Sequence, residues 1–137
     1  MPPPTTESTR HRRFDFRPGD GTVLGLDFLR QALADWRLSA SPVAVDALLV
    51  AGELLANAAD HTPGPQHLDL QWNGECLWIA VTDPVPNPPR PLPYRPETAH
   101  GHGLVIVERL SALWGHRPHR PGKTVWAELP APAPRSR

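Results

Sequence analysis

The sequence predicts an α+β fold, in which a mostly antiparallel sheet is covered on one face by about three helices, as a two-layer sandwich. Apolar residues alternate with polar ones in several short segments, which is the pattern of strands with one buried face. In longer segments they recur every three or four positions, which is the pattern of amphipathic helices. The expected order is strand, helix, helix, hairpin, loop, helix and strand. Because strands and helices are partly segregated, we expect the helices on one face and the other face more exposed.

The distribution of the 19 prolines separates the expected elements from the segments between them. Prolines crowd the first residues, residues 84–96 and the tail from Pro130 onward. Because proline lacks a backbone N–H, it is excluded from helix interiors and central strands. We therefore expect a disordered lead over residues 1–12, a single domain over residues 13–130 and a disordered tail over residues 131–137.

The first part of the domain is expected to hold one short strand and two helices. Residues 13–16 alternate as an edge strand, and apolar residues at helical spacing predict a helix over residues 22–36. Ser41 followed by Pro42 is typical of a helix start, with an N-cap and then proline at the first helical position. This second helix should end at the turn formed by residues 62–65.

The second part of the domain is expected to begin with a β-hairpin. Residues 67–72 and 76–83 are strand-like, and Asn73-Gly74 between them is a strong turn signal. A third helix should open near Gly103 and run to about Trp114, with Gly115 as its C-cap. Residues 123–129 then form a last strand.

Composition argues against several classes of function. The formal net charge is zero, so we expect no direct binding of nucleic acid and no membrane partner. No uninterrupted apolar stretch approaches membrane-spanning length, and the first residues lack the apolar core of a signal peptide, so we expect a cytoplasmic protein. The single cysteine, Cys76, lies in an apolar segment and is expected to be a small buried side chain.

A polar ridge crosses the second predicted helix. Glu53, Asn57 and His61 are spaced four residues apart, so they should lie on one face of that helix. The opposite, buried face is expected to hold Leu48, Gly52, Leu55, Ala56 and Ala59. For the ridge alone, a solvated helix face is the ordinary interpretation. Two later signals favour a binding site instead.

These later signals are Asp83, at the end of an apolar strand, and the glycine pair Gly101 and Gly103 at the mouth of a helix. Backbone amides at a helix start can receive phosphate oxygens, and glycines allow close approach. A strand-end carboxylate can accept a hydrogen bond from an exocyclic amine such as that of adenine. An amide oxygen such as that of Asn57 can coordinate Mg²⁺, and a carboxylate such as that of Glu53 can accept a proton.

In this order, the motifs resemble those of the GHKL ATPase superfamily and its Bergerat nucleotide-binding fold. Residues 53–61 resemble the N box of that family, residues 81–84 the start of its first glycine box, and residues 100–104 its second. Residues 122–126 resemble its closing strand. Within the superfamily the chain is most similar to actinobacterial anti-sigma-factor serine kinases and to related histidine-kinase-like ATP-binding regulatory proteins, over roughly residues 14–129.

The resemblance implies ATP and Mg²⁺ as cofactors and assigns roles to individual residues. Asn57 would ligate Mg²⁺, Glu53 would be the general base, and Asp83 would bind the adenine amino group. The remaining nucleotide contacts that it implies are His61, Gly101, His102, Gly103, Leu104 and Thr124. The chain departs from the family after Asp83, where prolines replace the usual glycines of the first glycine box.

Two classes of function follow from the resemblance. The first is an anti-sigma-type serine/threonine kinase that phosphorylates an antagonist protein in a partner-switching system. The alternative is a non-catalytic module that keeps the fold and sequesters a sigma factor or an antagonist. Intact Glu53 and Asn57 favour the enzyme, whereas the prolines after Asp83 favour the module. A histidine-kinase fragment is the weaker third reading, and whether the chain dimerises stays open.

Histidines gather near the third predicted helix, as they would at a zinc site. The histidines concerned are His100, His102, His116 and His119. Zinc sites usually hold their ligands at recurring spacings and often include cysteine, and Cys76 lies far from this group. We therefore expect no zinc site here.

Overall fold

The computed structural model describes residues 9–89 and 103–131, and it confirms the α+β class. The strands form one five-stranded sheet in the order β1-β2-β3-β5-β4, with every neighbouring pair antiparallel. The strands are β1 (Arg10–Asp15), β2 (His67–Trp72), β3 (Cys76–Asp83), β4 (Leu113–His119) and β5 (Gly122–Pro130). The helices are α1 (Thr22–Asp35), α2 (Pro42–His61) and α3 (Gly103–Leu110).

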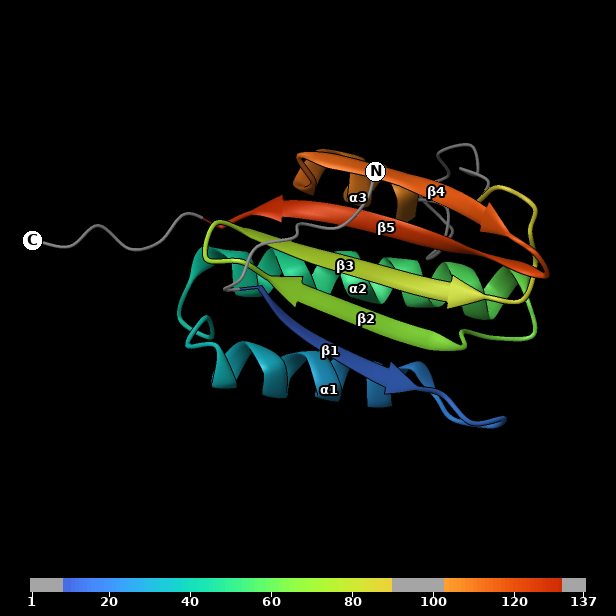
Figure 1. Ribbon diagram of the computed structural model, residues 1–137, viewed down its shortest axis with the longest axis horizontal. Coiled ribbons are helices and arrows are strands. Elements are labelled where there is room, and N and C mark those ends of the chain that lie inside the picture. Colours follow the sequence, from blue (N-terminus) through green and yellow to red (C-terminus); the bar gives the residue numbers. More distant parts are fainter. Residues whose placement is uncertain (1–8, 90–102, 132–137) are drawn as a thin grey trace, which may run out of the picture.

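All three helices lie on the same face of the sheet (Figure 1). Helix α2 runs behind the central strands, with α1 beside it near β1 and α3 beside it near β4. Both predicted boundaries of α2 are confirmed. The Ser41 side chain accepts a hydrogen bond from the backbone N–H of Val43, Pro42 is the first helical residue, and Thr62 is the C-cap.

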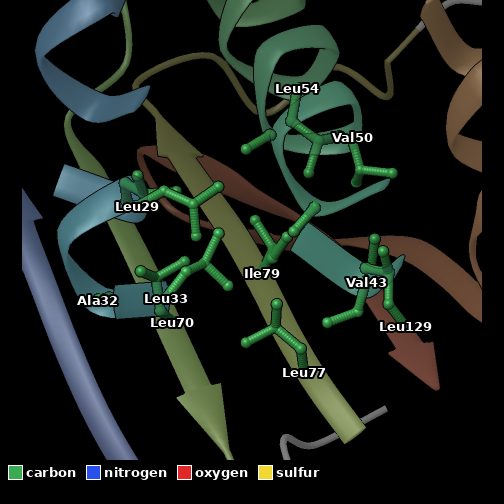
Figure 2. Close-up of a cluster of buried hydrophobic side chains, with 14 of the residues drawn as sticks. Leu29, Ala32, Leu33, Val43, Val50, Leu54, Leu70, Leu77, Ile79 and Leu129 are labelled. Carbon is green, nitrogen blue, oxygen red and sulfur yellow. The ribbon is translucent and has the colours of Figure 1, made fainter. Parts of the chain in front are cut away.

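The main core lies between the helices and the sheet (Figure 2). On the sheet side, alternate residues of β3 point toward the helices, and Leu77, Ile79 and Val81 are almost fully buried. Leu29 of α1 and Val50 of α2 meet them from the helix layer. Gly25 lets α1 approach closely, because a Cβ at this position would lie 2.8 Å from the Phe16 ring.

The buried face of α2 is broader than the sequence predicts and is rotated from the expected one. Its buried residues are Val43, Ala44, Ala47, Val50, Ala51, Leu54, Leu55 and Ala58. Ala59 is exposed, and Leu48, Gly52 and Ala56 are only partly buried, so most of the expected set was wrong. The reason is that α2 packs against the sheet, α1 and α3 at once, so its contacts extend over more than one face. Helix α2 is also long and apolar enough to span a membrane, so the expectation that no segment approaches such a length was wrong. A buried core helix passes the same test.

The third helix is shorter than predicted, and a strand was missed. Helix α3 ends at Leu110, and the segment expected to finish it forms β4, so Gly115 is not a C-cap. Trp114 packs on the main core from this strand, and Gly115 lies against the Trp126 ring, where an added Cβ would meet ring carbon at 3.0 Å. Pairing with β5 along its length therefore overrides the helical spacing of this segment. Strand β1 also begins at Arg10, before the expected start of the domain.

No helix in the described part of the chain covers the opposite face of the sheet (Figure 1). Trp78 and Trp126 are nevertheless buried there, and with Ala80 they form a second, smaller cluster. Polar side chains of the flanking strands surround the pair and form the walls of a shallow groove. They include His11, Arg13, Asp69, Gln71, Arg117 and His119. This face is therefore open to solvent at its rim but not at its tryptophans.

Candidate functional site

A cavity of about 200 Å³ lies where the end of α2 meets the end of β3 and the start of β5. Its residues are Leu54, Asn57, Ala58, His61, Val81, Asp83, Val85, Asn87, Pro88, Pro89, Lys123 and Val125. One part of the wall is apolar and comes from α2 and the two strands. The polar part holds an amide, an imidazole, a carboxylate and an ammonium group.

Strand register explains how β3 and β5 contribute to this cavity. Asp83 pairs with Lys123 and Val81 pairs with Val125 across the two antiparallel strands. Because successive side chains point to opposite faces, these four residues all point toward the helix layer. The cavity therefore has Val81 and Val125 as a floor, with Asp83 and Lys123 beside them.

Helix α2 supplies Asn57 and His61, one turn apart on the same face. Asn57 is half-buried, and His61 is exposed as the last residue of the helix. The helix stops here because Thr62 is extended (φ −142°, ψ 173°) and precedes Pro63, which cannot continue the helix. The backbone N–H and the hydroxyl of Thr62 both donate to the Ala58 carbonyl oxygen, at 3.0 and 2.6 Å. The structure thus brings Asn57, His61 and Asp83, three of the candidate site residues, together around one cavity.

A buried ion pair at the cavity wall was not predicted. The Nζ atom of Lys123 lies 3.1 Å from Oδ1 and 2.9 Å from Oδ2 of Asp83, and it donates to the Val85 carbonyl oxygen at 3.1 Å. Only 5% of Lys123 and 2% of Asp83 are exposed. A signal was present in the sequence, because Lys123 is the only lysine in the chain and begins an apolar strand. An ammonium group at such a place requires a partner.

Gly122 is what allows β5 to approach Asp83. A Cβ on Gly122 would lie 1.9 Å from the Asp83 backbone oxygen, which is far inside any allowed contact. Glycine is therefore required immediately before Lys123 for a steric reason. This close approach places the lysine ammonium next to the carboxylate.

The segment after Asp83 follows a course that prolines permit. The backbone N–H of Val85 donates to Asp83 Oδ1 at 2.9 Å, as in an Asx turn, and its carbonyl accepts from Lys123. Pro88 and Pro89 then form part of the cavity wall. These prolines contribute apolar surface where glycines would contribute flexible amides.

Other predicted site residues lie elsewhere. Glu53 is half-buried on α2, one turn before Asn57, and is not among the residues that line the cavity. Leu104 is buried in the first turn of α3, which begins at Gly103, while Gly101 and His102 lie outside the described residues.

Thr124 is not brought together with Asp83. It points to the opposite face of the sheet, where its hydroxyl forms hydrogen bonds with Thr82 Oγ1 at 3.0 Å and His119 Nε2 at 2.9 Å. His116 and His119 are exposed on β4, and His100 lies outside the described residues. Within residues 9–89 and 103–131, no group of three or more His, Cys, Asp or Glu side chains is placed to hold a metal ion.

An antiparallel sheet with helices on one face and a cavity of this composition fit a domain that binds a small, partly apolar molecule. The family model for the histidine kinase-, DNA gyrase B-, and HSP90-like ATPases matches residues 43–133, which is more than half of the 137 residues. The chain belongs to this family of ATP-binding domains. No curated protein matches the chain.

The residues of the cavity fit a nucleotide. The apolar floor suits the faces of a planar base, and Asp83 offers an acceptor at its edge. The half-buried Asn57 amide suits Mg²⁺, which prefers oxygen ligands. One feature of the cavity was not expected for such a site, since the Asp83 carboxylate is already paired with Lys123.

Proposed function

We propose that this protein binds Mg²⁺-ATP in the cavity between α2, β3 and β5 and acts as an anti-sigma-type serine/threonine kinase on a small antagonist protein. The convergence of Asn57, His61 and Asp83 on one cavity carries this proposal. The family match supports the nucleotide.

Each residue has a distinct role in the proposed reaction. Bound Mg²⁺ would offset the charge of the triphosphate, and Asn57 would hold the metal. Glu53 would accept the proton of a partner serine or threonine hydroxyl, whose oxygen then bonds to the γ-phosphorus. The bond from the γ-phosphorus to its bridging oxygen breaks, and ADP leaves with that oxygen.

Calorimetry tests the binding step directly. Titration with ATP should show saturable binding that is tighter with Mg²⁺ than with a chelator. Asn57→Ala should remove most of this Mg²⁺ dependence, whereas Gln31→Ala, an exposed polar residue on α1, should retain it. Folded protein that binds no nucleotide at millimolar ATP would contradict the proposal.

A second experiment separates binding from chemistry. Glu53→Gln should leave nucleotide affinity nearly unchanged and lower phosphoryl transfer by about two orders of magnitude or more. Asp46→Asn is the matched control, since this carboxylate lies two turns earlier on α2. Equal transfer by the Glu53 variant and the wild type would rule out the assigned base.

The acceptor can be identified with labelled ATP and candidate antagonist proteins. We expect slow intrinsic hydrolysis and an acid-stable phosphate on a serine or threonine of the partner. Acid-labile label on a histidine of this chain, or rapid hydrolysis without a partner, would defeat the kinase proposal.

A non-catalytic module that sequesters a sigma factor or an antagonist is the second candidate. It is favoured by the prolines in the cavity wall and by the pairing of Asp83 with Lys123. This candidate predicts a stable complex with the partner that forms equally well with and without ATP. A complex that forms only with nucleotide would exclude it.

A further inference from the structure

The polar end of the cavity presents a hydrogen-bond acceptor and donors side by side. Asp83 Oδ1 accepts from Val85 N–H and from Lys123, whereas the ammonium is the only partner of Oδ2 among the contacts of the described residues. The Lys123 ammonium has three N–H groups, and its contacts with Asp83 Oδ1 and the Val85 carbonyl are the longer ones, at 3.1 Å. A bound molecule could therefore take one lysine N–H and one lone pair of Oδ2 without separating the ion pair.

Such a pair differs chemically from a lone carboxylate. An ionised carboxylate only accepts, so it favours a base edge that donates. Adenine has a donor amine next to a ring acceptor, whereas hypoxanthine has a carbonyl acceptor next to a ring N–H donor. A lone buried carboxylate would face the hypoxanthine carbonyl without any donor for it, which is costly. The two edges present the same groups in opposite order, so an adjacent donor and acceptor can satisfy either base when that base turns over in the cavity.

We infer that Lys123 sets the base specificity of this site, so that the cavity accepts oxo-purine nucleotides as well as amino-purine nucleotides. The inference rests on the proposed binding of a nucleotide in this cavity. Lys123 acts here as a specificity-determining residue and takes no part in phosphoryl transfer. Its position at the cavity wall, opposite Asp83 in the strand register, carries the argument.

The test compares ATP with inosine triphosphate, which differs at the base edge alone. Wild-type protein should bind the two within about threefold of each other, because both edges find partners. Lys123→Met replaces the side chain with an unbranched one that is one atom shorter and has no donors, so it should favour ATP by about tenfold or more. Adding Asp83→Asn to Lys123→Met should bring the ratio back to within about threefold, because an amide both donates and accepts.

The single lysine supplies a readout that does not depend on affinity. With a ¹³C label on the lysine Cε, the side-chain NMR spectrum holds one signal, from Lys123. Both nucleotides should shift this signal, whereas tripolyphosphate, which lacks a base, should not. The measurement uses wild-type protein and therefore does not depend on the folding of a variant.

The outcomes distinguish the inference from the proposal beneath it. A wild-type preference for ATP of about tenfold or more, or a lysine signal that only ATP moves, overturns the inference and leaves nucleotide binding intact. Equal affinity of the Lys123→Met variant for the two nucleotides also overturns the inference. If neither nucleotide binds any of the folded proteins, the proposed function and the inference fall together.

Discussion

At the level of single residues, the closed end of the cavity depends on the neighbours Gly122 and Lys123. Glycine lets β5 lie directly against the Asp83 backbone, and lysine then satisfies a carboxylate that is almost fully buried. Breaking such a pair by removing one partner typically costs about 3–5 kcal/mol, because an uncompensated charge is left inside. This end of the cavity is thus held together by the protein's own ion pair.

Gly122→Ala should destabilise the protein by about 1–3 kcal/mol, since the new Cβ forces β5 away from the Asp83 carbonyl oxygen. The measurement is the midpoint of urea unfolding. Gly21→Ala is a suitable control, because a Cβ there meets no atom within 4 Å. A Gly122 variant as stable as this control would show that the strands can separate without cost.

Burial raises the pKa of the Cys76 thiol, and the nearby carboxylates of Glu128 and Glu75 raise it further. Because the thiolate is the nucleophile, alkylation of the folded protein should be slower than that of the unfolded chain near pH 8, and the gap should narrow as pH rises. The folded state favours the neutral thiol, so the raised pKa contributes to the free energy of unfolding. This contribution is complete below the pKa of Cys76 in the unfolded chain and is lost as pH rises through its pKa in the folded protein. Alkylation rates followed by mass spectrometry report on a single site, since the sequence has one cysteine. Equal folded and unfolded rates would contradict the raised pKa.

At the level of elements, α2 organises the molecule because it contacts the sheet and both other helices. The Ser41-Pro42 start and the Thr62 end are local signals, so the sequence was sufficient to predict its boundaries. The buried face of α2 depends on where α1 and α3 pack, and the spacing of apolar residues along α2 could not predict those positions.

Leu55→Ala should cost about 2–5 kcal/mol in unfolding free energy, because Leu55 is completely buried on α2. Leu49→Ala on the same helix removes the same atoms from a side chain that is 46% exposed and should cost less than about 1 kcal/mol. Both values come from chemical denaturation. Similar losses for the two variants would mean that α2 packs differently.

The missed strand shows the limit of local patterns more plainly. Trp114 and Leu110 recur at helical spacing, yet the chain leaves the helix between them because β5 offers a full ladder of partners. The same limit applies to the site. Motifs were sufficient to select Asn57, His61 and Asp83 as candidates. The contact between Lys123 and Asp83 depends instead on the register of β3 and β5. The same register determines the face of the sheet to which Thr124 points.

At the level of the whole molecule, the cavity joins segments that are distant in the sequence. Its walls come from the end of α2, the end of β3 and the start of β5, which are also the elements around the main core. A ligand that binds there interacts only with the assembled fold. Binding should therefore raise the stability of the entire domain.

Mg²⁺-ATP at about one hundred times its dissociation constant should stabilise the protein by about 2.7 kcal/mol, by mass action alone. Thermal unfolding with increasing nucleotide measures this, and the midpoint should keep rising with concentration. Asn57→Ala should show a smaller rise under the same conditions. A midpoint that does not respond to nucleotide would argue against a site built from these three elements.

The burial of Lys123 also determines how the folded protein reacts with reagents that modify lysine amines. The sequence contains one lysine, and in the fold its ammonium is enclosed by Asp83 and the Val85 carbonyl. Acylating reagents therefore find no lysine side chain on the folded surface, and they reach Lys123 only through the cavity or when β5 separates from β3. With a ligand in the cavity, the rate at which this single side-chain nitrogen is acylated would report the separation of β5 from β3.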